Sequence, residues 1–346
     1  MAVAHERIAY IDLAKGFCIL LVVVYHIMGY YVVESPVNTY GRMFRLPLYF
    51  FLSGVFFKTY GGFVDFLKRK TNKLLVPFAF WYLIGSVGMS MLLRYGFNRK
   101  LMGAKYFTLG PALTDFVMRD TFPNVAIWFL LCLFEVNILF YLIYKISNDC
   151  TKERTSVIVE LSLLSGIIGL VLGGMHVNIP CFVDSALTAL PFFSFGYLLN
   201  QNTDILRPNK YDRFNLIYVV SALGAVCAAT YWFGPELNLR ANEFNRSAAL
   251  MLYPAGIIGT MAMVLLAKAI GHLPVVSYFG RYSIMILVTH IVLMQLWFYA
   301  IRPLHLPRME AALLNIFLTL SSYFALIPLM RRLLPHVTAQ KDLIKL

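Results

Sequence analysis

Residues 282–301, YSIMILVTHIVLMQLWFYAI, hold no aspartate, glutamate, lysine or arginine over 20 positions. An α-helix of about 20 apolar residues is what crosses the roughly 30 Å hydrocarbon core of a bilayer. Four more stretches of similar length are equally free of these charges: residues 74–93, 214–233, 247–267 and 311–330. Because one soluble core does not accommodate five such segments, the sequence predicts a multi-span, all-α membrane protein.

The rest of the composition agrees with this interpretation. Of 346 residues, 60% are apolar and 14% are charged, whereas about a quarter of the residues in a soluble domain are charged. Leu46 to Phe57 gives only 12 uncharged positions, so the second span crosses only by thinning the bilayer or by drawing Arg45 below the interface. Five additional spans bring the predicted total to about ten: residues 12–33, 42–58, 125–144, 155–173 and 182–199.

The distribution of basic residues predicts the orientation. With the N-terminus in the cytoplasm, 19 of the 30 lysines and arginines fall on the inner face and 11 on the outer face. Inner loops of membrane proteins are enriched in lysine and arginine, so both termini are expected in the cytoplasm. We expect residues 1–346 to form a single membrane domain with no appended soluble domain.

Two other classes of site are not expected. The net charge is +13, but no basic run is longer than Lys68-Arg69-Lys70, so we do not predict a nucleic-acid surface. The five cysteines show no C-x-x-C spacing, so neither a metal site nor a disulfide framework is predicted.

The first predicted span carries the most ionisable residues. Asp12, Lys15, His26 and Tyr30 fall within about 60° of one another on a helix, and His26 lies about 16 Å beyond Lys15 along the axis. Placing an ionisable residue in the membrane interior costs several kcal/mol, and such residues are often found at functional sites. This stripe is predicted to line a path from the cytoplasmic surface towards the outer half of the membrane. The alternative is that Asp12 pairs with Lys15 at the interface while His26 bonds a neighbouring helix.

Six short motifs follow one another along the chain: Arg7-x4-Asp12-x2-Lys15-Gly16 with His26, Leu46–Gly54 (LPLYFFLSG), Lys70-x2-Lys73-Leu-Leu-Val-Pro77, Trp128-Phe-Leu-x2-Leu-Phe134, Leu190–Tyr197 (LPFFSFGY), and Gly280–Ser283 with His290. Together, in this order, they resemble the motifs of the acyltransferase-3 family of integral membrane acyltransferases, in the short form similar to fucose 4-O-acetylases. Two departures are that lysines 15, 70 and 73 stand where the family commonly has arginine, and that Leu133 stands where many members have glutamate.

The resemblance implies transfer of an acyl group, acetyl in the first instance, from cytoplasmic acyl-CoA to a hydroxyl of a cell-surface or polyprenyl-linked glycan. It also implies a bacterial inner membrane and no permanently bound cofactor. His26 and Asp12 are the predicted catalytic residues. An imidazole is a suitable base for a sugar hydroxyl near neutral pH. His26 could instead accept the acyl group and pass it on, and the sequence leaves both routes open.

Coenzyme A carries several phosphate charges, so its predicted binding residues are cationic: Lys15, Arg69, Lys70 and Lys73. The alternative is that these residues only face anionic lipid head groups. Four further residues are predicted to contact substrate: Tyr30, Arg45, Glu135 and His290. For Glu135 and His290, a purely structural bond between helices is equally compatible with the sequence. Asp184 and Arg45 could contact a sugar or each other.

Two rival functions differ in what they require of this polar stripe. A transporter or flippase for a polyprenyl-linked or acylated glycan needs a polar lining but no indispensable base. A non-catalytic subunit of a glycan-assembly complex needs neither, so replacing His26 would change only stability.

Overall fold

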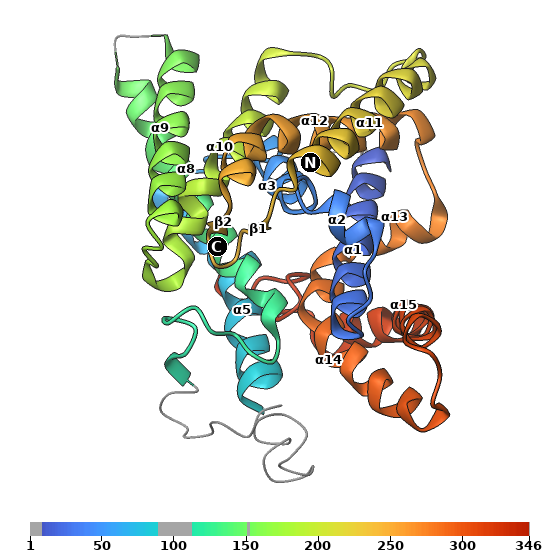
Figure 1. The fold of residues 1–346 in the computed structure, drawn as a ribbon. Coiled ribbons are helices and arrows are strands. Elements are labelled where there is room, and N and C mark those ends of the chain that lie inside the picture. The colour runs from blue at the N-terminus through green and yellow to red at the C-terminus, as the bar shows by residue number, and fades with distance from the viewer. Residues whose placement is uncertain (1–8, 89–112, 151–152, 346) are drawn as a thin grey trace.

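The computed structural model describes residues 9–88, 113–150 and 153–345, and these residues are predominantly helical (Figure 1). Among them, eight helices are long and apolar enough to cross a membrane. This confirms the predicted all-α membrane class. The eight helices are Ala9–Tyr30, Val125–Asp149, Arg154–Gly174, Pro180–Asn202, Asp212–Phe233, Arg246–Ile270, Ser283–Leu304 and Arg308–Leu333.

Each of these helices contains, or nearly contains, one of the predicted spans, and the labels of Figure 1 are used from here on. Their α-helical parts are α1 (Ala9–Tyr30), α8 (Trp128–Asp149), α9 (Arg154–Gly174), α10 (Val183–Asn202), α11 (Leu216–Phe233), α12 (Arg246–Ile270), α14 (Ser283–Ile301) and α15 (Arg308–Leu333). Short 3-10 segments extend four of them: η3 (Val125–Ile127), η4 (Pro180–Phe182), η5 (Asp212–Asn215) and η6 (Arg302–Leu304). The total of about ten spans and the orientation of the termini remain predictions.

The second predicted span is not one continuous helix. Within residues 42–58 the helix is α3 (Arg45–Val55), and a separate short helix, α2 (Pro36–Gly41), precedes this span. With 11 residues, α3 is about 16 Å long and reaches through roughly half of the hydrocarbon core. The helix begins at Arg45, the residue directly before the uncharged run of the sequence.

The third predicted span belongs to a longer helical segment that changes its winding. It runs through α4 (Phe63–Lys70), η1 (Thr71–Leu75), α5 (Val76–Tyr82) and η2 (Leu83–Gly88), of which η1 and η2 are π-helical. Pro77 has no N–H to donate and its ring crowds the preceding turn, so a wider turn just before it relieves the conflict. Residues 89–93 of this predicted span lie outside the described residues.

Helices α1 and α13 (Pro274–Arg281) meet backbone to backbone through two glycines. A Cβ atom on Gly16 would overlap the carbonyl oxygen of Val276, and one on Gly280 would overlap the carbonyl oxygen of Asp12. Small residues permit this close approach between membrane helices. The first and last of the six family-like motifs therefore form one packing contact.

Helices α3 and α10 meet in the same way. A Cβ atom on Gly54 would overlap the carbonyl oxygen of Phe193, and one on Gly196 would overlap that of Phe51. Two more of the motifs thus serve a packing contact, which places α3 against a helix distant in sequence.

The helices differ in how far the protein covers them. In Figure 1, α8, α9 and α10 stand side by side, while α1 contacts α12, α13 and α14. In the span Val125–Asp149, which contains α8, 72% of an apolar 18-residue stretch is buried inside the protein. In the span Asp212–Phe233, which contains α11, the corresponding share is 17%. Helix α8 is therefore largely interior, and most of α11 is left uncovered by the rest of the described chain. The described residues hold just two strands, β1 (Leu237–Asn238) and β2 (Glu243–Phe244), which form a small antiparallel hairpin.

Candidate active site

The structure brings together two of the predicted site residues, His26 of α1 and His290 of α14. Their ring centroids are 5.2 Å apart and the ring planes make an angle of 45°. His290 is fully buried, and His26 is partly accessible. The pairing arises because α1 and α14 run in the same direction, with Tyr30 also packed edge-on against Phe298 at 4.8 Å.

The hydrogen bonds of His290 determine which of its nitrogens carries a proton. Nδ1 lies 2.9 Å from the carbonyl oxygens of both Ile286 and Leu287. Carbonyl oxygens only accept hydrogen bonds, so Nδ1 is the donor and, in the neutral ring, Nε2 keeps its lone pair. Nε2 is buried and has no hydrogen-bond partner among the described residues. A basic nitrogen is thus held in place beside His26.

Arg45, the first residue of α3, lies beside the segment of α1 that carries His26. Its guanidinium carbon is 3.7 Å from the ring centroid of Tyr25, a short cation–π contact. The side chain is buried, and its Nη1 has no hydrogen-bond partner in the described part of the chain. Arg45 and Arg240 both interact electrostatically with the His26 side chain. An incoming group that accepts a hydrogen bond would satisfy Nη1.

A second polar cluster lies between the loop before α8, the start of α10 and the β-hairpin. Arg119 donates to Asp184 at 2.5 Å, to Ser185 Oγ at 3.0 Å and to the Arg240 carbonyl at 2.6 Å. Asp184 therefore pairs with Arg119, while Arg45 stacks on Tyr25, so the structure does not bring Asp184 and Arg45 together. Arg119 has a φ of 67°, a strained conformation for arginine that these bonds hold in place.

Glu135 of α8 lies near this second cluster. Asp184 and Arg119 both interact electrostatically with its carboxyl group. Its Oε2 is buried without a hydrogen-bond partner among the residues described. Glu135 is thus associated with Arg119 and Asp184, and the described contacts do not link it directly to His26.

The predicted cationic residues lie near the N-terminal end of α1, away from the histidine pair. Each of them contacts an aromatic ring or the C-terminal tail. Lys15 Nζ is 5.0 Å from the ring centroid of Phe56, and the Arg69 guanidinium is 4.6 Å from that of Tyr60. Lys70 Nζ lies 5.4 Å from the Phe66 ring, and burial lowers the pKa of the Lys70 ammonium to about 8. The ring contacts of Arg69 and Lys70 are compatible with binding of an anion.

Lys73 is engaged differently, by the C-terminal tail that follows α15. Its Nζ lies 3.2 Å from Asp342 Oδ1 and donates to the Ala339 carbonyl at 3.0 Å. Asn72 adds bonds to the main chain of Leu343 and Ile344. The tail thus covers part of the predicted donor-binding surface.

Asp12 lies in the first turn of α1, whose single helix also carries Lys15, His26 and Tyr30. The 14 residues from Asp12 to His26 place the two about 21 Å apart along the axis. The structure therefore does not bring Asp12 to the histidine pair.

The comparisons with known proteins bear on the whole chain. A family model described as an acyltransferase domain, that of the acyltransferase-3 family, matches residues 8–331. The chain is a member of the acyltransferase-3 family. The comparisons with curated proteins and with solved structures gave no match. Family membership supports acyltransferase activity in general and a multi-pass membrane protein.

Within this acyltransferase, the structure adds residues that the sequence did not single out. Arg240 links the two polar clusters, because its charge reaches His26 and its carbonyl accepts from Arg119. Asn124 donates to the Val288 carbonyl at 2.9 Å, close to His290 in the chain. Both residues lie in stretches between apolar runs, where polar side chains are ordinary, so no sequence signal separated them from other loop residues.

No group of three or more histidine, cysteine, aspartate or glutamate side chains in the described ranges is placed to hold a metal ion.

Proposed function

We propose that the protein transfers an acetyl group from cytoplasmic acetyl-CoA to a hydroxyl of a cell-surface or lipid-linked glycan, with His26 as the base, in a bacterial inner membrane. The observation that carries this proposal is the pairing of His26 with His290, about 16 Å along α1 from a cluster of cations. The proposal rests on acyltransferase-3 membership for the reaction class and on this arrangement for the roles of the residues.

The chemical step needs one proton acceptor. The glycan hydroxyl attacks the thioester carbonyl carbon while the His26 imidazole takes the hydroxyl proton. The tetrahedral intermediate then collapses, the C–S bond breaks, and the coenzyme A sulfur leaves as the thiol after receiving that proton from His26. In the two-step variant, His26 itself first carries the acetyl group.

His290 and Arg45 fit supporting roles in this step. With Nδ1 donating to backbone carbonyls, His290 is held in one orientation against the His26 ring, so we assign it the role of positioning that ring. The unpartnered Nη1 of Arg45 is available to the oxyanion of the intermediate. Donors held ready for a developing negative charge give a large part of catalysis in acyl transfer.

The cations at the start of α1 fit the phosphates of the donor. Lys15, Arg69 and Lys70 lie over aromatic rings, and the ring contacts of Arg69 and Lys70 hold those two side chains in place without cancelling their charge. Tyr30, Glu135 and the Arg119–Asp184 pair lie towards the other end of the helices, where we place the glycan acceptor.

The test uses the full chain in nanodiscs with radiolabelled acetyl-CoA and a crude lipid-linked glycan fraction. Replacing a general base removes about 10²- to 10⁴-fold of rate, so His26→Ala is expected to lower glycan-dependent turnover about 1,000-fold. The matched control is His305→Asn, because His305 is an exposed histidine with a φ of 49° that asparagine tolerates.

The outcomes separate the candidate functions. Turnover that disappears in His26→Ala and persists in His305→Asn supports the acyltransferase, and label retained on His26 supports the two-step route. Wild-type protein that consumes neither acetyl-CoA nor succinyl-CoA, yet moves labelled polyprenyl-linked glycan across a bilayer, would establish the transporter. Full turnover in His26→Ala would remove His26 from the mechanism.

A further inference from the structure

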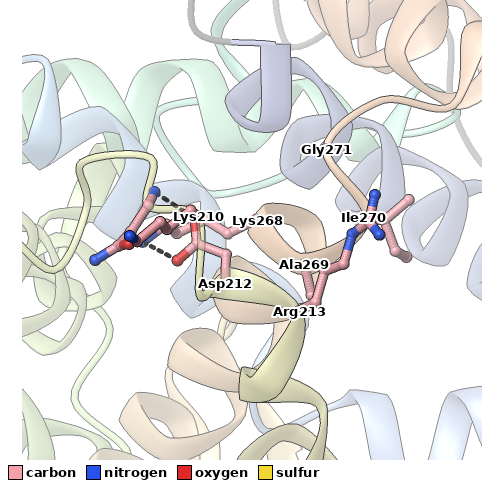
Figure 2. A pocket seen from close by; sticks show the side chains of 8 residues that line it. Lys210, Asp212, Arg213, Lys268, Ala269, Ile270 and Gly271 are labelled. Atoms are coloured by element: carbon pink, nitrogen blue, oxygen red, sulfur yellow. Dashed lines mark hydrogen bonds and ion pairs between the residues drawn. The ribbon is translucent and has the colours of Figure 1, made fainter.

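A shallow pocket lies away from the histidine pair, where the segment after α10 meets the end of α12. It is lined by Asn209, Lys210, Asp212, Arg213, Lys268, Ala269, Ile270 and Gly271 (Figure 2). The hydroxyl of Tyr10 donates to the Leu206 carbonyl nearby. This bond places the pocket at the same end of the bundle as the start of α1, close to the membrane surface.

One wall of the pocket is fixed by a buried ion pair. Lys268 Nζ lies 3.0 Å from Asp212 Oδ1, and the two side chains are 4% and 13% exposed. Lys268 also donates to the Ile205 carbonyl at 2.6 Å. The other carboxylate oxygen of Asp212 accepts from the Asn209 N–H at 2.8 Å. The single carboxylate lining the pocket is therefore fully occupied by its own neighbours.

Two cations remain to give the pocket its charge. Lys210 is exposed, with its Nζ 4.9 Å from the ring centroid of Tyr211, and Arg213 is exposed as well. Figure 2 shows Lys210 beside the Asp212–Lys268 pair, while Arg213 extends towards Ile270. With Asp212 neutralised by Lys268, the lining carries a net positive charge that suits a phosphate group.

The surface next to these cations is apolar and uncovered. Phe214 is 71% exposed, Ile217 is 73% exposed and Tyr218 is 70% exposed. They belong to the first turns of the α11 span, which the protein covers least of the eight. A ligand whose phosphate meets the positive charge of this pocket would therefore extend onto an apolar face that suits acyl chains.

We propose that this pocket binds the phosphate of an anionic phospholipid, whose acyl chains lie along α11. A soluble nucleotide would also match the positive charge, but it would gain nothing from the exposed apolar residues beside it. Basic pockets at the membrane surface are a common way for membrane proteins to hold anionic lipid head groups. The site is independent of the proposed acyl transfer, so each proposal can fail without the other.

The test is a titration of phosphatidylglycerol into the detergent-solubilised full chain, followed by native mass spectrometry. Each basic residue near an anionic lipid contributes roughly a factor of five to binding, so Lys210→Ala with Arg213→Ala is expected to weaken phosphatidylglycerol binding about 30-fold. The control removes the same two charges from the same end of the bundle, as Lys145→Ala with Arg332→Ala, both exposed and outside the pocket.

Three results would overturn the proposal. Equal loss in the pocket and control variants would show that only overall charge matters. Equal affinity for phosphatidylcholine would show that the pocket does not select an anionic lipid. Displacement of phosphatidylglycerol by coenzyme A or by inorganic phosphate at similar concentrations would assign the pocket to a soluble phosphate compound. Thermal unfolding of each variant confirms that the compared proteins are folded.

Discussion

The polar groups near the two ends of α1 differ in their surroundings and in their hydrogen bonding. At the Lys15 end, cations lie over aromatic rings or against the C-terminal tail, in contacts that an incoming anion can share or replace. At the His26 end, the polar atoms are buried and several have no hydrogen-bond partner within the described residues. Such atoms are unfavourable unless a substrate or water satisfies them. The difference favours reversible capture of a charged donor at one end and chemistry at the other.

The largest expected effect, after that of His26 itself, is at His290. Replacing His290 with alanine removes the lone pair beside His26, and we expect turnover to fall about 100-fold with the KM for acetyl-CoA unchanged. His290→Gln offers an amide oxygen near the position of Nε2 and should recover part of the rate. Steady-state kinetics in nanodiscs measures both constants.

A structural role for His290 predicts a different pattern. In that case His290→Ala and His290→Gln would lower the yield of folded protein, and the folded fraction would keep the wild-type kcat and pH profile. A shifted pH profile in the folded fraction supports the positioning role.

The next largest effect concerns the packing that sets the Lys15 end of α1. A Cβ atom at Gly16 would overlap the Val276 carbonyl oxygen, whereas Gly29, at the other end of the same helix, has no neighbour within 4 Å of an added Cβ. We expect Gly16→Ala to destabilise the protein by about 2 kcal/mol. Gly29→Ala should be neutral or slightly stabilising. Thermal unfolding in one detergent compares the two, and equal melting temperatures would contradict the close α1–α13 contact.

The sequence predicted the long helices well and the contacts between them poorly. Apolar runs bounded by charges give eight of the predicted spans directly, and the short uncharged run after Arg45 already indicated that α3 differs from the others. The pairing of His26 with His290 depends on how two distant helices pack, which no periodicity encodes. The Lys73–Asp342 pair joins residues far apart in the chain, and Arg119 and Arg240 lie in loops where a positive charge has an ordinary explanation.

A smaller effect, at the cationic end, depends on pH. The pKa of Lys70 is lowered by burial to about 8, so its ammonium is charged below pH 8 and becomes neutral as the pH rises through that value. We expect acetyl-CoA to bind about five-fold more weakly once Lys70 is neutral, from the loss of one cation. Isothermal titration at pH values on both sides of 8 measures this change.

Lys70→Arg provides the control for that titration, because arginine stays protonated throughout the range. Its affinity for acetyl-CoA should be independent of pH over the same interval. A decline of the same size in Lys70→Arg would assign the effect to another group and remove Lys70 from the donor site.

The smallest expected effect tests whether the C-terminal tail competes with the donor. Asp342→Asn removes the charge that pairs with Lys73, and the two side chains are partly exposed, at 34% and 44%. Exposed pairs contribute little, so we expect acetyl-CoA to bind only about two-fold more tightly. Asp204→Asn, which breaks the exposed pair with Arg207, controls for the change in net charge. Weaker binding in Asp342→Asn, with Asp204→Asn unchanged, would mean that the tail helps to form the donor surface, because Lys73 then needs Asp342 to hold its ammonium in place.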